Sequence, residues 1–278
     1  MRMFVTGGTG LLGRALVAEA PALGWAVTAT HHAQVPSAEG VSWVRLDVRD
    51  RDAVRAAITA ARPDAVVHTA YVQGGPDLRA ITADGSAHVA AAARDAGARL
   101  VHLSTDVLFD GERDGLYAED DAVCPVNDYG RAKADAERRV LDATDDAVSV
   151  RTSLLYTLAP DDRQAGLALD LAAGRARGAL FTDEIRCPVL ARELAVALCE
   201  LAQGSYRGVL HVAGPEALSR HAFGALLVRY HGGDAALLPA AKSADQPVRR
   251  PRNLALSSER ARALLRAALR GPSEALRG

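Results

Sequence analysis

A glycine-rich run near the N-terminus constrains the fold of this chain more than any other feature. Gly7, Gly10 and Gly13 follow a short apolar segment and open a segment rich in leucine and alanine. In such a run the first glycine permits a tight turn, the second lets a pyrophosphate approach the backbone, and the third lets a helix pack closely on a strand. The free N–H groups of the helix N-terminus then attract phosphate. The run predicts a strand, a loop and a helix that bind a dinucleotide.

Short apolar runs and alanine-rich segments alternate through the first half of the chain. Strands are expected at 3–6, 26–30, 42–46, 65–68, 99–104 and 147–151, and helices at 11–23, 50–62, 81–96 and 129–143. The expected strands lack polar alternation, which is typical of parallel strands buried on both faces. Strands that alternate with helices form a parallel sheet covered on both sides. The sequence therefore predicts an α/β fold with a doubly wound, Rossmann-type sheet.

The second half is less regular and predicts a smaller lobe at the carboxyl edge of the sheet. Helices are expected at 191–201, 221–230 and 257–269, a strand at 209–212, and loops at 161–165 and 240–251. The dinucleotide-binding domain is expected to comprise residues 1–155, with returning elements at about 176–213. The substrate-binding lobe is expected to comprise residues 156–175 and 214–278.

Composition excludes several classes of partner. The net charge of −1 favours neither nucleic acid nor an anionic membrane surface. The three cysteines have no paired or metal-like spacing, and the N-terminus has no signal-peptide pattern. We expect a cytoplasmic protein that acts on a small molecule as a monomer or homodimer.

The segment after the second expected strand bears on the choice of cofactor. An acidic residue there would bind the ribose 2′-hydroxyl of NAD, but the strand ends in His31 and His32. A neutral or cationic end suits a 2′-phosphate, so NADPH is favoured over NADH. The alternative for the two histidines is a solvated loop, and for Asp47 it is a turn or a helix cap. The expected cofactor contacts in this half are Gly7, Gly10, Leu11, Leu12, Gly13, Arg14, His31, Asp47 and Val48.

Thr105, Tyr129 and Lys133 indicate a reaction type. Tyr129 and Lys133 are four residues apart, so they share one face of the expected helix. A nearby ammonium favours the phenolate and brings the tyrosine pKa toward the range of general acid catalysis. Thr105 ends an expected strand and could hydrogen-bond the same substrate oxygen. The alternative is a structural helix with one buried tyrosine and a surface lysine.

These residues lie in longer motifs that resemble the extended short-chain dehydrogenase/reductases, and most closely the dTDP-4-dehydrorhamnose reductase branch. The resemblance covers nearly the whole chain. It rests on Thr-Gly-Gly-Thr-Gly-Leu-Leu-Gly at 6–13, Arg-Pro-Asp-Ala-Val-Val-His at 62–68, Leu-Ser-Thr-Asp-Val-Leu-Phe-Asp-Gly at 103–111, Pro-Val-Asn-Asp-Tyr-Gly-Arg-Ala-Lys at 125–133, Arg-Thr-Ser-Leu-Leu-Tyr at 151–156 and Arg-Pro-Arg-Asn-Leu-Ala-Leu at 250–256.

The resemblance implies roles for individual residues. Thr105, Tyr129 and Lys133 would be catalytic, Lys133 would also hold the nicotinamide ribose, and Arg252 would face a substrate diphosphate. Further implied contacts are Ala70, Tyr71 and Thr82 for the cofactor and Asp106, Val107 and Leu154 for the substrate.

Departures from the family pattern narrow the expected chemistry. Val107 stands where related dehydratases carry a glutamate for elimination, which favours a plain reductase. Ala15 replaces an acid that binds magnesium at a dimer contact in some members, so no metal is expected. Leu154 replaces a tryptophan that shapes the sugar pocket, so the substrate is less certain than the chemistry.

The sequence thus predicts NADPH-dependent reduction of a keto group on a nucleotide-activated 4-keto-6-deoxysugar, with Tyr129 as the proton donor. Two alternatives remain at this stage. One is reduction of a non-nucleotide ketone from a biosynthetic pathway. The other is a non-catalytic, NADP-binding regulatory subunit.

Overall fold

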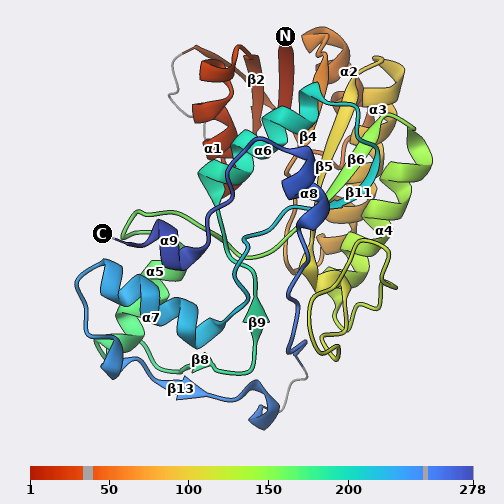
Figure 1. Ribbon diagram of the computed structural model, residues 1–278. Coiled ribbons are helices and arrows are strands. Elements are labelled where there is room, and N and C mark those ends of the chain that lie inside the picture. Colours follow the sequence, from red (N-terminus) through yellow and green to blue (C-terminus); the bar gives the residue numbers. More distant parts are fainter. Residues whose placement is uncertain (34–39, 247–249, 278) are drawn as a thin grey trace.

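A seven-stranded parallel sheet forms the centre of the molecule (Figure 1). The computed structural model describes residues 1–33, 40–246 and 250–277, and the part of the loop expected at 240–251 that falls at 247–249 lies outside them. The strand order is β11-β6-β5-β4-β1-β2-β3, and each neighbouring pair is parallel. The predicted Rossmann-type α/β fold is confirmed. The strands are β1 (Arg2–Thr6), β2 (Ala26–His31), β3 (Val41–Arg45), β4 (Ala65–His68), β5 (Arg99–Thr105), β6 (Ala147–Thr152) and β11 (Gly208–His211).

Helices cover both faces of this sheet. One face packs against α1 (Leu11–Glu19) and α6 (Ala191–Gln203), and the other against α2 (Arg51–Ala61), α3 (Gly85–Asp95) and α4 (Asp128–Ala143). Within β1, Met3 and Val5 join the first core while Phe4 joins the second. Because each strand buries both sets of side chains, an apolar run without polar alternation is the pattern such a strand requires.

The chain reverses direction across the sheet between β1 and β4. From β1 it builds outward through β2 and β3, and it then returns to β4 on the other side of β1. Such a switch point leaves a crevice outside the carboxyl ends of the strands, where doubly wound sheets bind their ligands. The glycine run follows β1 at this crevice, and Thr105 is the last residue of β5.

A smaller group of elements lies beside the carboxyl ends of the strands (Figure 1). Its helices α5 and α7 pack together, and three short two-stranded sheets accompany them. The expected division of the chain, with the smaller lobe at 156–175 and 214–278, stays a prediction, and several of these elements fall at 180–190, within the segment expected to return to the first domain. The elements are β7 (Leu155–Tyr156), α5 (Arg163–Ala172), β8 (Leu180–Phe181), β9 (Ile185–Arg186), β10 (Val189–Leu190), β12 (Leu218–Ser219), α7 (Arg220–Tyr230), β13 (Ala240–Ala241) and α9 (Pro272–Ala275). The short helix α8 (Glu259–Leu264) instead packs against β11 of the central sheet.

Three expectations for the second half were wrong in their extent. The segment expected as a loop at 240–251 contains β13 and a 3₁₀ turn at Ser243–Asp245. The loop expected at 161–165 contains the start of α5, because the Asp162 carboxylate accepts the N–H groups of Gln164 and Ala165 and caps that helix. The helix expected at 257–269 is confined to α8. Beyond α8, the Glu200 carboxylate of α6 accepts the N–H groups of Arg266 and Ala267, so these residues bond to another helix instead of extending their own.

Two helices of the first half also differ from expectation. The helix expected at 11–23 ends at Glu19, and a separate 3₁₀ turn follows at Pro21–Leu23. The helix expected at 81–96 begins with a π turn, η2 (Ala80–Asp84), before α3. In η2 the Thr82 hydroxyl donates to the carbonyl of Val72, and this hydrogen bond links η2 to the segment that follows β4.

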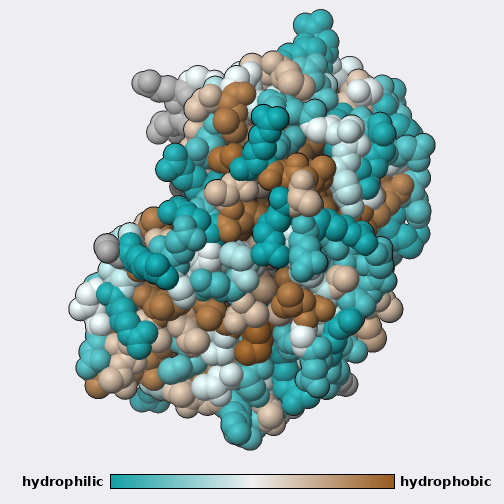
Figure 2. Space-filling view, in the orientation of Figure 1, coloured by the Kyte–Doolittle hydropathy of each residue, from teal (hydrophilic) through white to brown (hydrophobic). Residues whose placement is uncertain are grey.

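The surface is of mixed polarity. Figure 2 shows apolar residues in small groups between polar ones on the face in view. Within the described ranges, no helix is long and apolar enough to cross a membrane.

The close packing of α1 on β1 yields a prediction for Gly13. A Cβ there would lie 2.1 Å from the carbonyl oxygen of Gly7, a backbone atom that cannot move aside. We expect Gly13→Ala to lower the free energy of unfolding by about 1–3 kcal/mol, measured by urea denaturation. The matched control is Gly166→Ala in α5, where a Cβ meets no atom within 4 Å and alanine favours the helix by up to about 1 kcal/mol. Equal losses in the two variants would contradict this account.

Candidate active site

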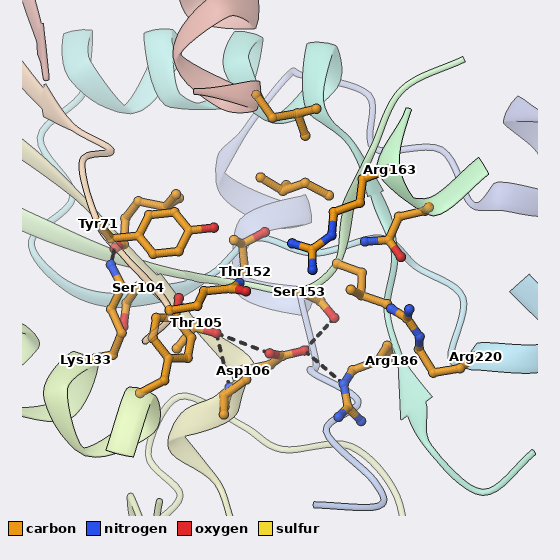
Figure 3. Close-up of a pocket in the computed structure, with 18 of the residues that line it drawn as sticks. Tyr71, Ser104, Thr105, Asp106, Lys133, Thr152, Ser153, Arg163, Arg186 and Arg220 are labelled. Atoms are coloured by element: carbon orange, nitrogen blue, oxygen red, sulfur yellow. Dashed lines mark hydrogen bonds and ion pairs between the residues drawn. The ribbon is translucent and has the colours of Figure 1, made fainter. Parts of the chain in front are cut away.

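A cleft of about 460 Å³ opens where the carboxyl ends of β5 and β6 face α4, α5 and the smaller lobe (Figure 3). Thr105 closes β5, while Tyr129 and Lys133 project from α4. All three line the cleft, and Tyr129 and Lys133 lie on one helix as their spacing predicted. The lining residues are Leu11, Tyr71, Gln73, Leu103, Ser104, Thr105, Asp106, Val107, Tyr129, Lys133, Thr152, Ser153, Leu154, Leu155, Asp162, Arg163, Gln164, Leu167, Glu184, Arg186, Arg220 and Arg250.

The start of α4 is fixed by two local features. The Asn127 side chain accepts the N–H of Gly130 at 2.8 Å and caps the helix. Gly130 itself lies against the turn after β5, and a Cβ there would be 2.4 Å from the carbonyl oxygen of Val107. The glycine beside Tyr129 therefore lets α4 approach the strand that carries Thr105.

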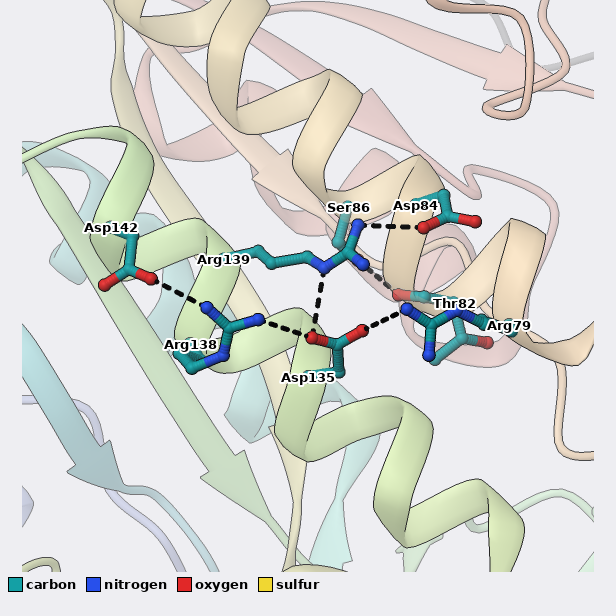
Figure 4. Close-up of polar contacts among 8 residues, drawn as sticks. All are labelled: Arg79, Thr82, Asp84, Ser86, Asp135, Arg138, Arg139 and Asp142. Carbon is teal, nitrogen blue, oxygen red and sulfur yellow. Dashed lines mark hydrogen bonds and ion pairs between the residues drawn. The ribbon is translucent and has the colours of Figure 1, made fainter.

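The outer side of α4 carries charge pairs to η2 and to the residue before it (Figure 4). Arg139 bonds Asp84 at 2.8 Å and Asp135 at 3.0 Å, and Arg79 lies 3.2 Å from Asp135. The partially exposed members of such a network contribute little individually. Together they connect the helix that carries Tyr129 and Lys133 to its neighbours.

The protonation of Tyr129 differs from the expectation. Burial raises the pKa of Tyr129, with smaller contributions from Tyr71 and Asp106, while a hydrogen bond with the Thr105 side chain opposes the rise. Lys133 Nζ donates to the carbonyl of Leu103 at 2.8 Å and lies 4.9 Å from the centroid of the Tyr71 ring, so its hydrogen bond is made to β5. The phenol is therefore protonated at neutral pH, the form from which a proton can be donated.

Lys133 is buried, with a relative exposure of 2%. Burial lowers the pKa of Lys133 to about 7, and the carboxylate of Glu137 opposes that shift. The amine therefore titrates near neutral pH, where its charge responds to small changes around it.

Asp106 is the centre of a polar group beside Thr105 (Figure 3). Its carboxylate accepts from the hydroxyl of Ser153 at 2.6 Å and from that of Thr105 at 3.3 Å, and Arg186 lies 3.9 Å away. Burial raises the pKa of Asp106, and the charge of Arg186 opposes this. Arg186 also donates to the carbonyls of Ile185, Pro251 and Arg252, so it connects Asp106 to the last part of the chain.

Four arginines line the cleft: Arg163, Arg186, Arg220 and Arg250. Figure 3 shows the first three on the side away from Tyr71 and Lys133. Burial and the neighbouring charge of Arg186 lower the pKa of Arg220. Glu184 pairs with Arg250 and also lines the cleft. Four guanidinium groups against a few carboxylates suit an anionic ligand with several oxygens.

The glycine run fits a dinucleotide phosphate. Gly10 occupies the N-cap of α1 without a side-chain cap, which leaves the first N–H groups of the helix to a ligand. Leu11 faces the cleft, whereas the Leu12 side chain is buried in the core, so Leu12 can offer only its backbone N–H. Arg14 donates to the carbonyl of Thr9 and stays at the surface.

The residues expected to contact the adenosine part of the cofactor differ in burial and in their hydrogen-bond partners. His31 is buried, and its Nδ1 has no hydrogen-bond partner among the residues that the structure describes. Asp47 is bound by Arg49 at 2.6 Å and lies 3.6 Å from His32, and the hydrogen bond from Arg49 contributes most to lowering the pKa of Asp47 to about 2. Val48 is buried and accepts a hydrogen bond from His88 at its carbonyl.

The structure separates the remaining expected contacts. Tyr71, Asp106, Val107 and Leu154 lie in the cleft wall, and Ala70 lies beside the glycine run. Arg252, expected at a substrate diphosphate, is outside the residues that line the cleft and bonds Glu112 at 3.0 Å.

Several functional candidates were not predicted from the sequence. Arg163, Arg186 and Arg220 come from three separate elements, and no local motif marks them. The neighbouring Arg250 belongs to the Arg-Pro-Arg-Asn motif, which was the available signal. No cluster of three or more His, Cys, Asp or Glu side chains suited to a metal occurs among the residues that the structure describes.

The sheet edge, the glycine run and the Thr, Tyr and Lys set are those of an NAD(P)-dependent oxidoreductase of the extended short-chain dehydrogenase/reductase class. The family comparison is more specific. Residues 1–277 match the sequence model of the RmlD substrate binding domain, and the chain belongs to that family.

Curated relatives agree with this assignment. A probable low-salt glycan biosynthesis reductase, Agl14, of Haloferax volcanii is 32% identical over 270 residues, covering 92% of this chain and 89% of the relative. The dTDP-4-dehydrorhamnose reductase of Mycobacterium tuberculosis is 32% identical over 257 residues, covering 91% and 83%.

Solved structures share the fold. A dTDP-4-dehydrorhamnose reductase of Bacillus anthracis in complex with NADP has a TM-score of 0.84 at 24% identity, covering 99% of this chain and 95% of the other. A hypothetical dTDP-4-dehydrorhamnose reductase of Sulfolobus tokodaii has a TM-score of 0.80 at 27% identity, covering 96% of each chain.

Proposed function

We propose that this protein reduces a keto group on a nucleotide-activated 4-keto-6-deoxysugar, with NADPH as the reductant and Tyr129 as the proton donor. The observation that carries the proposal is that Thr105, Tyr129 and Lys133 line one cleft together with four arginines. The names of the curated relatives from Mycobacterium tuberculosis and Streptomyces niveus support keto reduction of a dTDP-linked sugar.

The residues divide the chemistry between them. A bound reduced nicotinamide would supply the hydride to the carbonyl carbon. Tyr129, held in its protonated form by burial, donates its proton to the carbonyl oxygen as negative charge develops there. The Thr105 hydroxyl donates a hydrogen bond to the same carbonyl oxygen. The charged amine of Lys133 lies near Thr105 and Tyr129 and favours the negative charge that develops there.

The preference for NADPH rests on the end of β2. His31 and His32 follow where an acid would select the ribose of NAD, and Arg14 lies at the surface of the neighbouring helix. Asp47 is engaged by Arg49, which reduces its ability to bind a ribose hydroxyl. At equal cofactor concentration, the rate of substrate reduction should therefore be higher with NADPH than with NADH.

The nucleotide part of the substrate is assigned to the arginine side of the cleft. Arg163, Arg220 and Arg250 can each donate to diphosphate oxygens, and Arg163 is exposed at the first turn of α5. Arg250 rather than Arg252 is positioned for this role. Leu154 lines the same cleft and leaves more room for the sugar than a tryptophan would.

A binding subunit is the second candidate function, favoured by one observation. The chain is 29% identical over 277 residues to the methionine adenosyltransferase 2 subunit beta of Pongo abelii. NADPH binding without oxidation across a panel of keto-sugars and free ketones would support that function. Reduction of a free ketone with no effect of added nucleoside diphosphate would support the non-nucleotide alternative.

The first test concerns Tyr129. We expect Tyr129→Phe to lower kcat for a dTDP-4-keto-6-deoxysugar roughly 10²- to 10⁴-fold, because the proton donor is removed while the ring is kept. NADPH oxidation at 340 nm measures the rate, and circular dichroism checks the fold. Tyr230→Phe in α7 is the matched control and should retain full activity. Full activity of Tyr129→Phe would refute the assignment.

The second test concerns Arg163. Loss of a charged hydrogen bond to a diphosphate should raise KM for the nucleotide sugar roughly 10- to 100-fold in Arg163→Gln, with little change in kcat. The control is Arg175→Gln, just after the same helix, where the arginine pairs with Asp170 at the surface. An unchanged KM would place the nucleotide elsewhere.

A further inference from the structure

Lys133 adjoins a line of buried polar groups to which the proposed chemistry gives no role. His68 of β4 and His102 of β5 stack with ring centroids 5.7 Å apart, and His102 Nδ1 lies 3.1 Å from the hydroxyl of Ser149 in β6. Ser149 donates in turn to Glu137 of α4 at 3.1 Å. Polar groups buried in a sheet core cost free energy unless they are paired, so such a line requires a reason.

Glu137 occupies a specific place on α4. It follows Lys133 by four residues, so the two side chains share the face that Tyr129 begins. Its carboxylate accepts two hydrogen bonds from Arg151 Nε and one from Arg151 Nη2, the latter at 2.6 Å. Glu137 and Arg151 are 6% and 3% exposed, so this is a buried ion pair one helical turn from the lysine.

The elements packed against Lys133 each supply a group beside its amine. The sheet supplies His68, His102 and the carbonyl of Leu103, and the segment after β4 supplies the ring of Tyr71. Burial lowers the pKa of both histidines, to about 3 for His68, so neither carries charge at neutral pH.

The helix itself supplies Tyr129 and Glu137. Burial raises the pKa of Tyr129, which is therefore also neutral. Glu137 is the carboxylate that favours the charged amine, and Arg151 lies behind it.

Composition adds an independent observation. The chain has 33 lysines and arginines, and two of them, Lys133 and Lys242, are lysines. A basic position in this chain is therefore nearly always arginine, whose guanidinium keeps its proton throughout the physiological range. At position 133 the chain carries an amine, which can lose its proton when buried.

We propose that Glu137 is a positioning residue for the reduction: its carboxylate, fixed by Ser149 and Arg151, keeps the buried amine of Lys133 charged. The role rests on the proposed function, since donation of the proton leaves a phenolate on Tyr129, and a positive charge one helical turn away favours that phenolate. Arg151 holds the Glu137 carboxylate in place through its hydrogen bonds. Its positive charge also weakens the attraction of that carboxylate for the Lys133 ammonium. The two members of the ion pair therefore act on Lys133 in opposite directions.

The test reads Lys133 directly. Because the chain has two lysines, protein labelled with ¹³C-lysine gives two Cε signals, and Lys242→Arg assigns them. The pH titration of the Lys133 signal is compared in the native protein, Glu137→Gln and Arg151→Met. In Glu137→Gln we expect the midpoint to fall by about one pH unit, so that at pH values above the midpoint the charged fraction of Lys133 is about tenfold smaller. In Arg151→Met we expect the midpoint to rise.

Opposite shifts separate this role from a structural one. Glu193→Gln on α6 is the control, because it breaks the ion pair with Arg270 on the other side of the sheet and should leave the midpoint unchanged. If Glu137→Gln does not fold, Glu137→Gln/Arg151→Met is compared with Arg151→Met, and the midpoint should be lower in the double variant. An unchanged midpoint on loss of Glu137, or shifts of one sign in both single variants, would overturn the proposal.

The activity profile links the titration to the reaction. The pH at which kcat/KM falls as Lys133 loses its proton should move with the midpoint in each variant. Midpoints that shift while the activity profile stays fixed would overturn the positioning role. Absence of any keto-sugar reduction by the native protein would instead overturn the proposed function, whatever the titration shows.

Discussion

The burial of one lysine amine organises the centre of this molecule. An ammonium ion withdrawn from water costs several kcal/mol unless partners replace the water. Lys133 receives a carbonyl from β5, the face of an aromatic ring and a carboxylate one helical turn away. Each partner comes from an element that must lie in one place for the lysine to be accommodated. The partners that stabilise the Lys133 amine therefore also fix the position of α4 against β5 and β6.

The parallel sheet converts this local arrangement into a reaction site. Carboxyl ends of parallel strands meet at one edge, so the glycine run after β1 and Thr105 at the end of β5 open on the same crevice. The smaller lobe adds arginines to the opposite wall. A dinucleotide on the sheet side and an anionic substrate on the lobe side would meet at Tyr129.

The sequence predicted the parts whose information is local. Apolar runs located every strand of the central sheet, and the four-residue spacing located Tyr129 and Lys133 on one helical face. It did not predict the shortening of the helix at 257–269, because the competing carboxylate of Glu200 comes from a distant helix. The arginines at 163, 186 and 220 were missed for the same reason. Their convergence depends on tertiary structure, and no motif in its own segment marks any of the three. The pKa of Tyr129 was expected to fall, but spacing could not show that Lys133 points toward Leu103.

The central claim is that one cleft passes a hydride to a sugar carbonyl while Tyr129 supplies the proton. The most direct measurement is the fate of deuterium from NADPH deuterated at the nicotinamide C4 position. With a dTDP-4-keto-6-deoxysugar as substrate, the account predicts one deuterium on the new carbinol carbon and none at other sugar carbons, by NMR and mass spectrometry. Product without deuterium when each face of the nicotinamide is labelled in turn, or NADPH bound but never oxidised, would contradict it.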